Sequence, residues 1–466
     1  MNKPSGRFPR LKLIPFALAS SLTLAMSPGA FAESMTFQQI VERSLEQNPN
    51  IQVGQAQIDQ AQAAFEKAKK SKMPKVNLSL TGTVSNNPLN VFGMKLQQRQ
   101  ASFNDFGADE FFGNNYNTEP DSLNNPGVHT DFNTRIEVLV PVWNGGKIGY
   151  YQEQAQAMIR AARGGDEAIR QHLVFWDYKA YEAVHAARAY IDVAKQAKKT
   201  ADEFVRTTQN LVDQGVIVRS ELLSALVNQS NAEVSIAKAE QQEQMALDGL
   251  KTLMNMDFNE PLDVADHVEF VLEDKSAAEL VEEAYKNNPE LVAMREQIEA
   301  EQQKVKIAQA AEKPSFNVMV RQDWNDENLG LDASSYTVAG VASWTITDFG
   351  VTESDVNMAR SGVSQKHAEL EARKNKLRME IFKAWRTLKV AERQVTTSSL
   401  AVDQATEAQE LIKRRFENGV ATVTEVLASQ TQLDKANADL VSAEYEVNVQ
   451  RAQLRLLTGT ITIKWN

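Results

Sequence analysis

The sequence predicts a mainly α-helical fold that carries a few membrane β-strands and is built from two copies of one unit. Three observations lead to this prediction. Landmark residues recur at two constant offsets, short segments alternate apolar and polar residues, and two proline-free stretches of about 65 residues keep a helical pattern.

The first 32 residues have the organisation of a secretory signal peptide. A basic start (Lys3, Arg7, Arg10 and Lys12) precedes an apolar run that is too short to span a membrane. Ala30-Phe31-Ala32 then supplies the small-x-small pattern that signal peptidase reads. We expect the mature chain to begin at Glu33, outside the cytoplasm. The alternative is an uncleaved N-terminal anchor.

The composition excludes several classes of function. The formal net charge is -11, and removal of the four basic signal residues gives -11 - 4 = -15. Such an acidic chain is a poor ligand for nucleic acid, which needs clustered Lys and Arg. The chain has 0 Cys, which excludes disulfides, thiolate metal sites and a lipid-bearing N-terminal Cys.

Repeated landmarks indicate an internal duplication. Capping boxes open both copies, at Thr36 with Gln39 and at Ser276 with Glu279. The pairs Pro49/Pro289 and Pro74/Pro314 are 240 positions apart, and the pairs Gly146/Gly350, Gly215/Gly419 and Leu253/Leu457 are 204 apart. The first copy therefore contains 240 - 204 = 36 extra residues between Pro74 and Gly146.

Each copy is predicted to contain a helix of about ten turns, two strands, a very long helix, a short glycine-containing turn and another long helix. We assign residues 33–255 to the first repeat, 256–275 to a linker, 276–460 to the second repeat and 461–466 to a C-terminal tail. Residues 86–131, rich in Asn, Gly and Pro, are expected to form a long loop. Its phenylalanines (Phe103, Phe106, Phe111 and Phe112) are expected to pack on one another or on the rim of the sheet.

The alternating segments predict four strands, at about 75–85, 132–143, 315–324 and 336–347. Strands of about ten residues with one apolar face are typical of outer-membrane proteins, although a water-soluble sheet with one buried face shows the same alternation. Four strands are too few to close a barrel, and an open sheet edge is costly in lipid. If these strands cross a membrane, several protomers must therefore share one β-barrel.

Two helices are predicted to be exceptionally long, at residues 147–212 and 351–416. At 1.5 Å per residue each forms a rod of about 100 Å. Small residues recur on one side of the first rod, at Ala180, Ala183, Ala187, Ala194 and Ala197. This composition favours a hollow helical cylinder over a solid bundle.

Glycines stand where each second strand passes into a long helix, at Gly145, Gly146 and Gly350. Glycine permits the sharp change in backbone direction that such a junction needs. Trp143 and Trp344 precede these glycines, where an aromatic belt would meet the membrane–water interface. Ordinary packing at a junction between domains is the alternative explanation for both tryptophans.

In these motifs the chain resembles the TolC-type outer-membrane efflux protein family. The resemblance rests on the paired Asn-Pro helices, the junctions "VPVWNGG" and "WTITDFG", the turns "QGVIVRSELL" and "NGVATVTEVL", and the terminal "QLRLLTG". It implies a homotrimer with a twelve-stranded barrel in the outer membrane and a helical tunnel through the periplasm. It also implies a periplasmic membrane-fusion adaptor and an inner-membrane RND, ABC or MFS pump, in drug efflux, metal-ion export or type I secretion.

The resemblance further implies that the periplasmic entrance lies at the two helix–helix turns. Glu221 and Glu425 match its acidic positions, and Phe416 matches an aromatic closing contact. A second acidic position of the family is Ala428 here, and the basic partner is Ala421, so the usual closing contacts are depleted. Thr422 and Glu425 also form a capping box, which is an alternative explanation for that acid.

The sequence shows none of the patterns expected of an enzyme. The five histidines lack metal-ligand spacing, and His172 and His185 are interpreted as ordinary residues of a helix surface. The chain contains neither a complete phosphate-binding loop nor a G-x-S-x-G nucleophile motif. We therefore expect no enzymatic activity and no cofactor. The alternative to a transport duct is a soluble periplasmic or secreted coiled-coil protein, such as an adaptor or an adhesin stalk.

Overall fold

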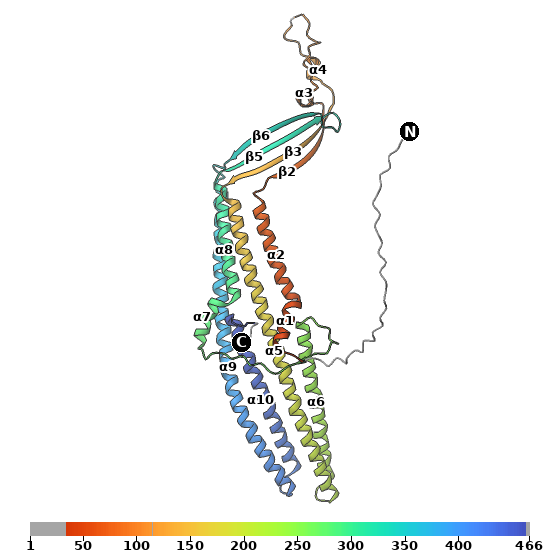
Figure 1. Cartoon of the computed structure of the whole chain (residues 1–466), viewed down its shortest axis with the longest axis vertical. Coiled ribbons are helices and arrows are strands. Elements are labelled where there is room, and N and C mark those ends of the chain that lie inside the picture. Colours follow the sequence, from red (N-terminus) through yellow and green to blue (C-terminus); the bar gives the residue numbers. More distant parts are fainter. Residues whose placement is uncertain (1–33, 114, 463–466) are drawn as a thin grey trace, which may run out of the picture.

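The computed structural model describes residues 34–113 and 115–462 of the 466-residue chain. The predicted signal peptide and the last residues of the predicted tail, 463–466, lie outside the described residues. The described chain is elongated, with a four-stranded sheet near one end and long helices running from the sheet to the other end (Figure 1).

The two copies contain the same principal elements in the same order. The first copy comprises β1 (Ser34–Met35), α1 (Phe37–Gln47), α2 (Pro49–Lys70), β2 (Lys75–Ser85), α3 (Pro88–Gln97), η1 (Phe103–Phe106), α4 (Asp121–Asn124), β3 (His129–Asn144), α5 (Lys147–Asp213) and α6 (Arg219–Leu253). The second comprises β4 (Asp263–Val264), α7 (Ala277–Asn287), α8 (Pro289–Gln309), η2 (Ala310–Glu312), β5 (Ser315–Asp326), β6 (Ala333–Ser343), α9 (Val351–Glu417) and α10 (Val423–Thr458).

The first helix of each copy is broken at its Asn-Pro, so the prediction of one helix of about ten turns is wrong. Proline disfavours a helical conformation for the residue before it. Asn48 is accordingly extended and caps α2 by accepting a hydrogen bond from the Asn50 amide. Its side-chain amide also donates to the Leu253 carbonyl at the end of α6, at 2.8 Å. The Asn288 side-chain amide makes the corresponding bond to the Leu457 carbonyl at the end of α10. Each break is thus held against the end of another helix.

The four main strands form one antiparallel sheet in the order β2-β3-β5-β6. The predicted and observed bounds differ most in β3 and β6. β3 begins three residues earlier, at His129, and β6 occupies Ala333–Ser343 instead of 336–347. Trp344 therefore lies after the strand. Within the described residues, β2 and β6 pair on one side only, so both edges of the sheet are open.

The register gives the sheet one apolar and one polar face. Val76 lies opposite Val138, which lies opposite Val320, and these three side chains share a face with Leu78. The Val76 and Leu78 side chains are 67% and 73% exposed in the single chain. Polar and charged residues occupy the alternate positions: Asn77, Ser79 and Thr81 on β2, Asn133 and Arg135 on β3, and Arg321, Asp323 and Asn325 on β5.

The helices form two long antiparallel hairpins beyond the sheet. α5 packs against α6 and α9 against α10, while α10 also packs against α5 (Figure 1). α6 and α9 therefore lie on the two flanks. Gly164 of α5 contacts α8, since a Cβ there would lie 3.1 Å from the Cα of Ala293. No helix of residues 34–113 or 115–462 combines the length and apolarity that a membrane crossing requires.

The apolar core is concentrated where α1 and α7 meet the long helices. Phe37 and Phe270 both contact the ring of Tyr178 there. Residues 256–275, predicted as a linker, contribute β4 and the fully buried Phe270 to this core. Ile461, assigned to the tail, is also buried in it. Residues 256–275 and Ile461 are thus packed parts of the fold.

The insertion of the first copy contains helices, so the prediction of a long loop at residues 86–131 is wrong in part. It contains α3, η1 and α4, which stand beyond the end of the sheet farthest from the long helices (Figure 1). Phe92 and Phe106 pack edge to face with centroids 4.8 Å apart, and Lys95 pairs with Asp105 at 2.5 Å. This pairing, together with hydrogen bonds donated by the Ser102 amide and hydroxyl, lowers the pKa of Asp105 to about 2.

Candidate functional site

The two strand-to-helix junctions depend on glycines with positive φ. Gly145 and Gly146 have φ values of 66° and 89°, and Gly350 has 95°. A side chain at Gly145 would also meet a neighbouring backbone, because its Cβ would lie 2.7 Å from the Ala310 carbonyl oxygen. Asp348 caps the helix in the second junction by accepting a hydrogen bond from the Thr352 amide at 2.8 Å. The junction residues thus have a structural role that requires no ligand.

The two junction tryptophans lie on the surface near the helix end of the sheet. Trp143 packs against Phe316, with ring centroids 5.8 Å apart. Trp344 is 62% exposed, and its Nε1–H donates to the Glu312 carbonyl at 3.0 Å. Each indole is therefore partly exposed and also has a partner within the protomer. An interfacial role remains a prediction.

The two helical hairpins end in turns of the same geometry. Gly215 and Gly419 have φ values of 73° and 71°. The following amides, of Val216 and Val420, donate back to carbonyls in the last helical turn at 2.9 and 2.8 Å. These are the bonds of a glycine-terminated helix end. Both valines are largely exposed, so each tip presents an apolar residue.

The two acidic residues at these tips differ in their local bonds. The Glu425 carboxylate accepts from the Thr422 amide, and the Thr422 hydroxyl accepts from the Glu425 amide, both at 3.3 Å. Glu221 occupies the equivalent position in α6, but the cap residue there is Val218, which offers no side-chain hydrogen bond. Glu425 therefore caps its helix, whereas Glu221 has no such partner at its own cap.

The Phe416 side chain is buried within the protomer. It is 4% exposed and packs against the Phe204 ring at a centroid distance of 5.2 Å. Ala225, Val423 and Val426 complete this apolar cluster. It joins α5 and α6 to α9 and α10, so its contribution here is to hold the two hairpins together. Ala421 packs beside the cluster, and Ala428 is exposed.

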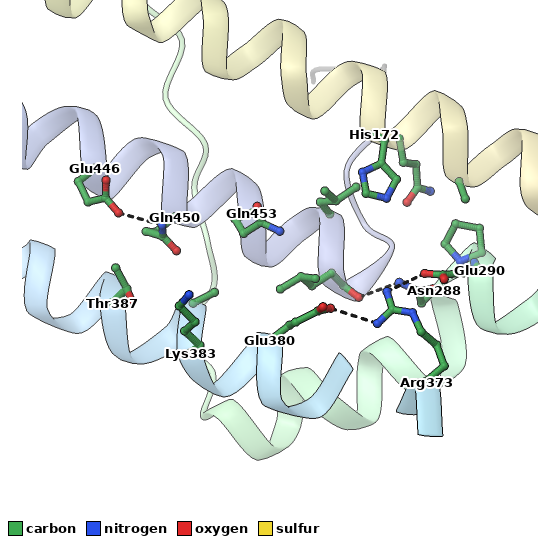
Figure 2. A pocket seen from close by; sticks show the side chains of 16 residues that line it. His172, Asn288, Glu290, Arg373, Glu380, Lys383, Thr387, Glu446, Gln450 and Gln453 are labelled. Carbon is green, nitrogen blue, oxygen red and sulfur yellow. Dashed lines mark hydrogen bonds and ion pairs between the residues drawn. The ribbon is translucent and has the colours of Figure 1, made fainter. Parts of the chain in front are cut away.

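A polar cavity of about 590 Å³ lies between α5, α8, α9 and α10 (Figure 2). Arg373 bridges Glu290 at 2.6 Å and Glu380 at 3.1 Å in its wall. His172 also faces the cavity, and burial lowers the pKa of its imidazole. The sequence interpretation of His172 as a plain surface residue missed this cavity, because it forms only where α8 and α10 meet end to end.

A second group of polar residues is buried beside the apolar core. Asp177 is fully buried and accepts a hydrogen bond from the Ser44 hydroxyl at 2.8 Å. Burial raises the pKa of Asp177 well above its usual value. Glu182 contacts His267 at 2.9 Å. The nearby His185 is half-buried, which lowers its pKa to about 4, so it also differs from an ordinary surface histidine.

These groups do not form a recognisable catalytic or metal centre. Across the described ranges 34–113 and 115–462, no three His, Cys, Asp or Glu side chains are placed to hold a metal ion. Arg373 is neutralised by its two carboxylates. The chemically distinctive surfaces are therefore extended ones: the apolar and polar faces of the sheet, and the two hairpin tips.

Known proteins resemble the chain in both sequence and structure. The sequence profile of a family described as outer membrane efflux protein matches residues 40–256 and 280–460. Outer membrane protein TolC of Vibrio cholerae is 25% identical over 194 residues. That match covers 40% of this chain and 42% of TolC, so the chain aligns with less than half of that relative.

Two solved structures share the arrangement of nearly the whole chain. CusC, described in connection with transmembrane channel formation, superposes with a TM-score of 0.75 at 14% identity, covering 93% of this chain and 95% of CusC. The outer membrane protein VceC of Vibrio cholerae gives 0.71 at 16% identity, covering 91% and 96%. At such low identity these likenesses establish the fold alone, and that fold is the duplicated helical and four-stranded unit described above.

Proposed function

Because this chain belongs to the outer membrane efflux protein family, we propose that three copies form one outer-membrane duct. Members of the family reside in the outer membrane and extend into the periplasm, and this localisation holds for the chain. In the proposed assembly the four strands of each protomer contribute to one shared barrel. The long hairpins continue it as a tunnel through the periplasm.

The open sheet with an exposed apolar face is the observation that carries the proposal. Unpaired backbone groups at β2 and β6 would cost several kcal/mol each in lipid. Pairing β2 of one protomer with β6 of the next would satisfy both edges. Closure would also place the apolar face toward lipid and the polar face toward the pore, as in outer-membrane barrels.

The flanks of the hairpins support the same assembly. α6 carries exposed apolar residues (Leu223, Val227 and Val234), and α9 carries another set (Val390, Leu400 and Leu411). These two helices lie on opposite flanks, so a ring of copies would bring the α6 residues of one protomer toward α9 of its neighbour. A soluble coiled-coil adaptor or stalk, the alternative function, would leave the apolar face of the sheet in water.

We further propose that the duct operates with a periplasmic adaptor and an inner-membrane RND, ABC or MFS pump, in efflux or type I secretion. In this arrangement the hairpin tips are the periplasmic entrance. Glu221, which has no capping partner, would supply the acidic side chains that line the opening. Glu425 would contribute less because its carboxylate already caps α10.

A substitution pair on β2 tests the barrel. Leu78→Asp places a charge on the apolar face of the sheet. On the lipid face of a barrel, Arg or Lys near the middle of the membrane costs about 2–4 kcal/mol, and Asp costs less. Three copies multiply that penalty. We expect the heat-modifiable trimer to disappear from the outer-membrane fraction, whereas Asn77→Asp on the polar face preserves it. A wild-type chain recovered as a soluble monomer would refute the duct.

A second pair tests the entrance in planar bilayers. Glu221→Gln is expected to weaken the cation preference and divalent-cation block of the purified trimer. Glu425→Gln should change both properties less, because glutamine also serves in a capping box. Equal ion selectivity in the wild type, both single variants and the double variant would remove the acidic entrance from the proposal.

A further inference from the structure

Residues Gln97–Arg99, here called the strap, cross the polar face of the sheet at the end farthest from the long helices. The Gln98 side-chain amide donates to Asp131 Oδ1 at 2.9 Å and to the Thr130 carbonyl at 2.8 Å. Asn325 of β5 donates to Gln97 Oε1 at 3.4 Å, and Arg99 donates to the Ser334 carbonyl of β6 at 2.6 Å. The strap therefore contacts three of the four strands.

The register shows which face the strap covers. Asp131 lies opposite Thr83 of β2, and Asn325 lies opposite Asn133 of β3. These positions belong to the polar face. On the same face, Arg135 and Asp323 lie two residues closer to the helices than Asn133 and Asn325. The apolar residues Val84 and Phe132 occupy the other face.

Buried hydrogen bonds hold the strap in place. Gln98, Asp131 and Asn325 are each 5% exposed. The Asp131 carboxylate accepts from both amides, with Asn325 Nδ2 at 2.9 Å from Oδ2. A buried carboxylate that loses a donor is left partly unsatisfied, which is unfavourable. Release of Gln98 is therefore unfavourable, and the strap is a fixed part of this face.

The strap is continuous with the folded insertion of the first copy. α3 contacts β3 and α4, and its Val91 is fully buried. α3 ends at the strap with Arg99 in the left-handed region, at φ 57°, while the Gln100 amide donates to the Lys95 carbonyl at 2.8 Å. The second copy contains only residues 327–332 between β5 and β6. The strap and the insertion therefore belong to the first copy alone.

We propose that the strap, present three times in the assembled duct, forms an outer constriction that limits the size of what leaves the pore. This proposal rests on the proposed function, because the polar face lines the pore only in a closed barrel. The constriction would lie at the opposite end of the duct from the hairpin tips. Its size limit would therefore apply whether the periplasmic entrance is open or shut.

Cysteine labelling from outside intact cells tests the strap without involving the periplasmic entrance. The chain has 0 Cys, so Asn77→Cys introduces a single thiol. Asn77 lies on the polar face of β2, closer to the helices than Thr83, the partner of Asp131. The probes are a small maleimide and a bulky polymer-linked maleimide. Asn328→Cys, in the short β5–β6 connection outside the strap, is the accessible control.

The Asn77→Cys chain is compared with two variants, one that releases the strap from the sheet and one that deletes it. In one, Gln98→Ala and Arg99→Ala cut its side-chain bonds. In the other, the sequence of residues 327–332 replaces residues 86–128. We expect the bulky reagent to modify the cysteine severalfold faster in both variants, with little change for the small reagent. Phe112→Ser, at an exposed position of the insertion, should leave both rates unchanged.

Two results would overturn the constriction. One is equally fast modification by the bulky reagent with the strap intact. The other is an unchanged rate in both strap variants, provided that each forms heat-modifiable trimers. If even the small reagent fails to reach Asn77→Cys in these variants while Asn328→Cys reacts, the polar face does not line an open pore. That result would refute the proposed function itself.

Discussion

The two repeats contain the same principal elements, but one pair of buried positions is polar in the first repeat and apolar in the second. In the first repeat the buried Ser44 hydroxyl donates to the buried Asp177 carboxylate. The offsets of 240 and 204 bring Ala284 and Ile381 to the equivalent positions of the second repeat, and both are fully buried. One repeat thus contains a polar pair where the other contains an apolar pair.

This difference shows that the fold does not require the polar pair. Burying a carboxylate carries a desolvation cost that one hydrogen bond offsets only in part. Asp177 Oδ2 has no hydrogen-bond partner among the described residues. The apolar pair of the second repeat avoids this cost. We therefore expect the first repeat to be the more sensitive of the two to pH at this level of the helices.

The largest effect is expected when the polar residue is moved into the second repeat. Ile381→Asp removes a buried side chain, a change that costs about 2–5 kcal/mol for truncation alone, and also buries a carboxyl group. The midpoint of trimer dissociation in a thermal gel assay should fall strongly. Ile381→Val, expected to cost about 0.5–1.5 kcal/mol, is the control.

Adding Ala284→Ser to Ile381→Asp recreates the pair of the first repeat. The new hydroxyl can donate to the carboxyl group, so the double variant should recover part of the loss, by about 1–3 kcal/mol. A double variant no more stable than Ile381→Asp alone would contradict the equivalence of the two positions. So would an Ile381→Asp chain as stable as Ile381→Val.

A smaller, pH-dependent effect is expected for Asp177→Asn. Because burial raises the pKa of Asp177 in the folded chain, the unfolded chain releases this proton at lower pH. The contribution of Asp177 to stability is therefore fully present below the ordinary pKa of 3.8 and declines as pH rises toward the folded value. The decline is at most about 1.4 kcal/mol per pH unit for one group.

The asparagine variant cannot ionise, so its stability advantage over the wild type should grow as pH rises above 3.8. Thermal dissociation midpoints measured across this pH range test the difference. Asp192→Asn, at an exposed position of the same helix, should follow the wild-type profile. Parallel profiles for the wild type and Asp177→Asn would show that Asp177 does not titrate in this way.

The repeats also show what could be predicted from the sequence. The long helices were predicted to within one residue, since α5 covers Lys147–Asp213 and α9 covers Val351–Glu417. A strong periodic pattern without proline determines such elements locally. The Asn-Pro break had a local cause too, but the prediction weighed the surrounding helical pattern more heavily than the effect of proline on the preceding residue.

Other features depend on contacts between distant segments. Phe416 is predicted as an aromatic closing contact at the entrance, and the sequence could not show that its ring packs against Phe204 of the other hairpin. α3 begins at Pro88 after the capping residue Asn87, a recognisable start signal that the Asn, Gly and Pro content of the segment obscured. The strap bonds could not be predicted, because they join Gln98 to β3 and Arg99 to β6 across the folded sheet.

The smallest predicted effect concerns the caps at the two hairpin tips. Val218 has φ -83° and ψ 154°, close to the -89° and 158° of Thr422, so threonine fits its backbone. Val218→Thr places a threonine three residues before Glu221 and completes a capping box like that of the second repeat. We expect α6 to gain about 1 kcal/mol, seen as slower amide exchange in its first turn.

The same substitution sharpens the functional comparison of the two tips. A capping Glu221 would bond to the backbone of residue 218 and be withdrawn from the opening. Val218→Thr should therefore shift the ion selectivity of the trimer in the same direction as Glu221→Gln, although by less. Val218→Ala, which adds no acceptor, is the matched control. Slower exchange in α6 with unaltered selectivity would mean that Glu221 acts only on helix stability, and the acidic entrance would then lose its principal residue.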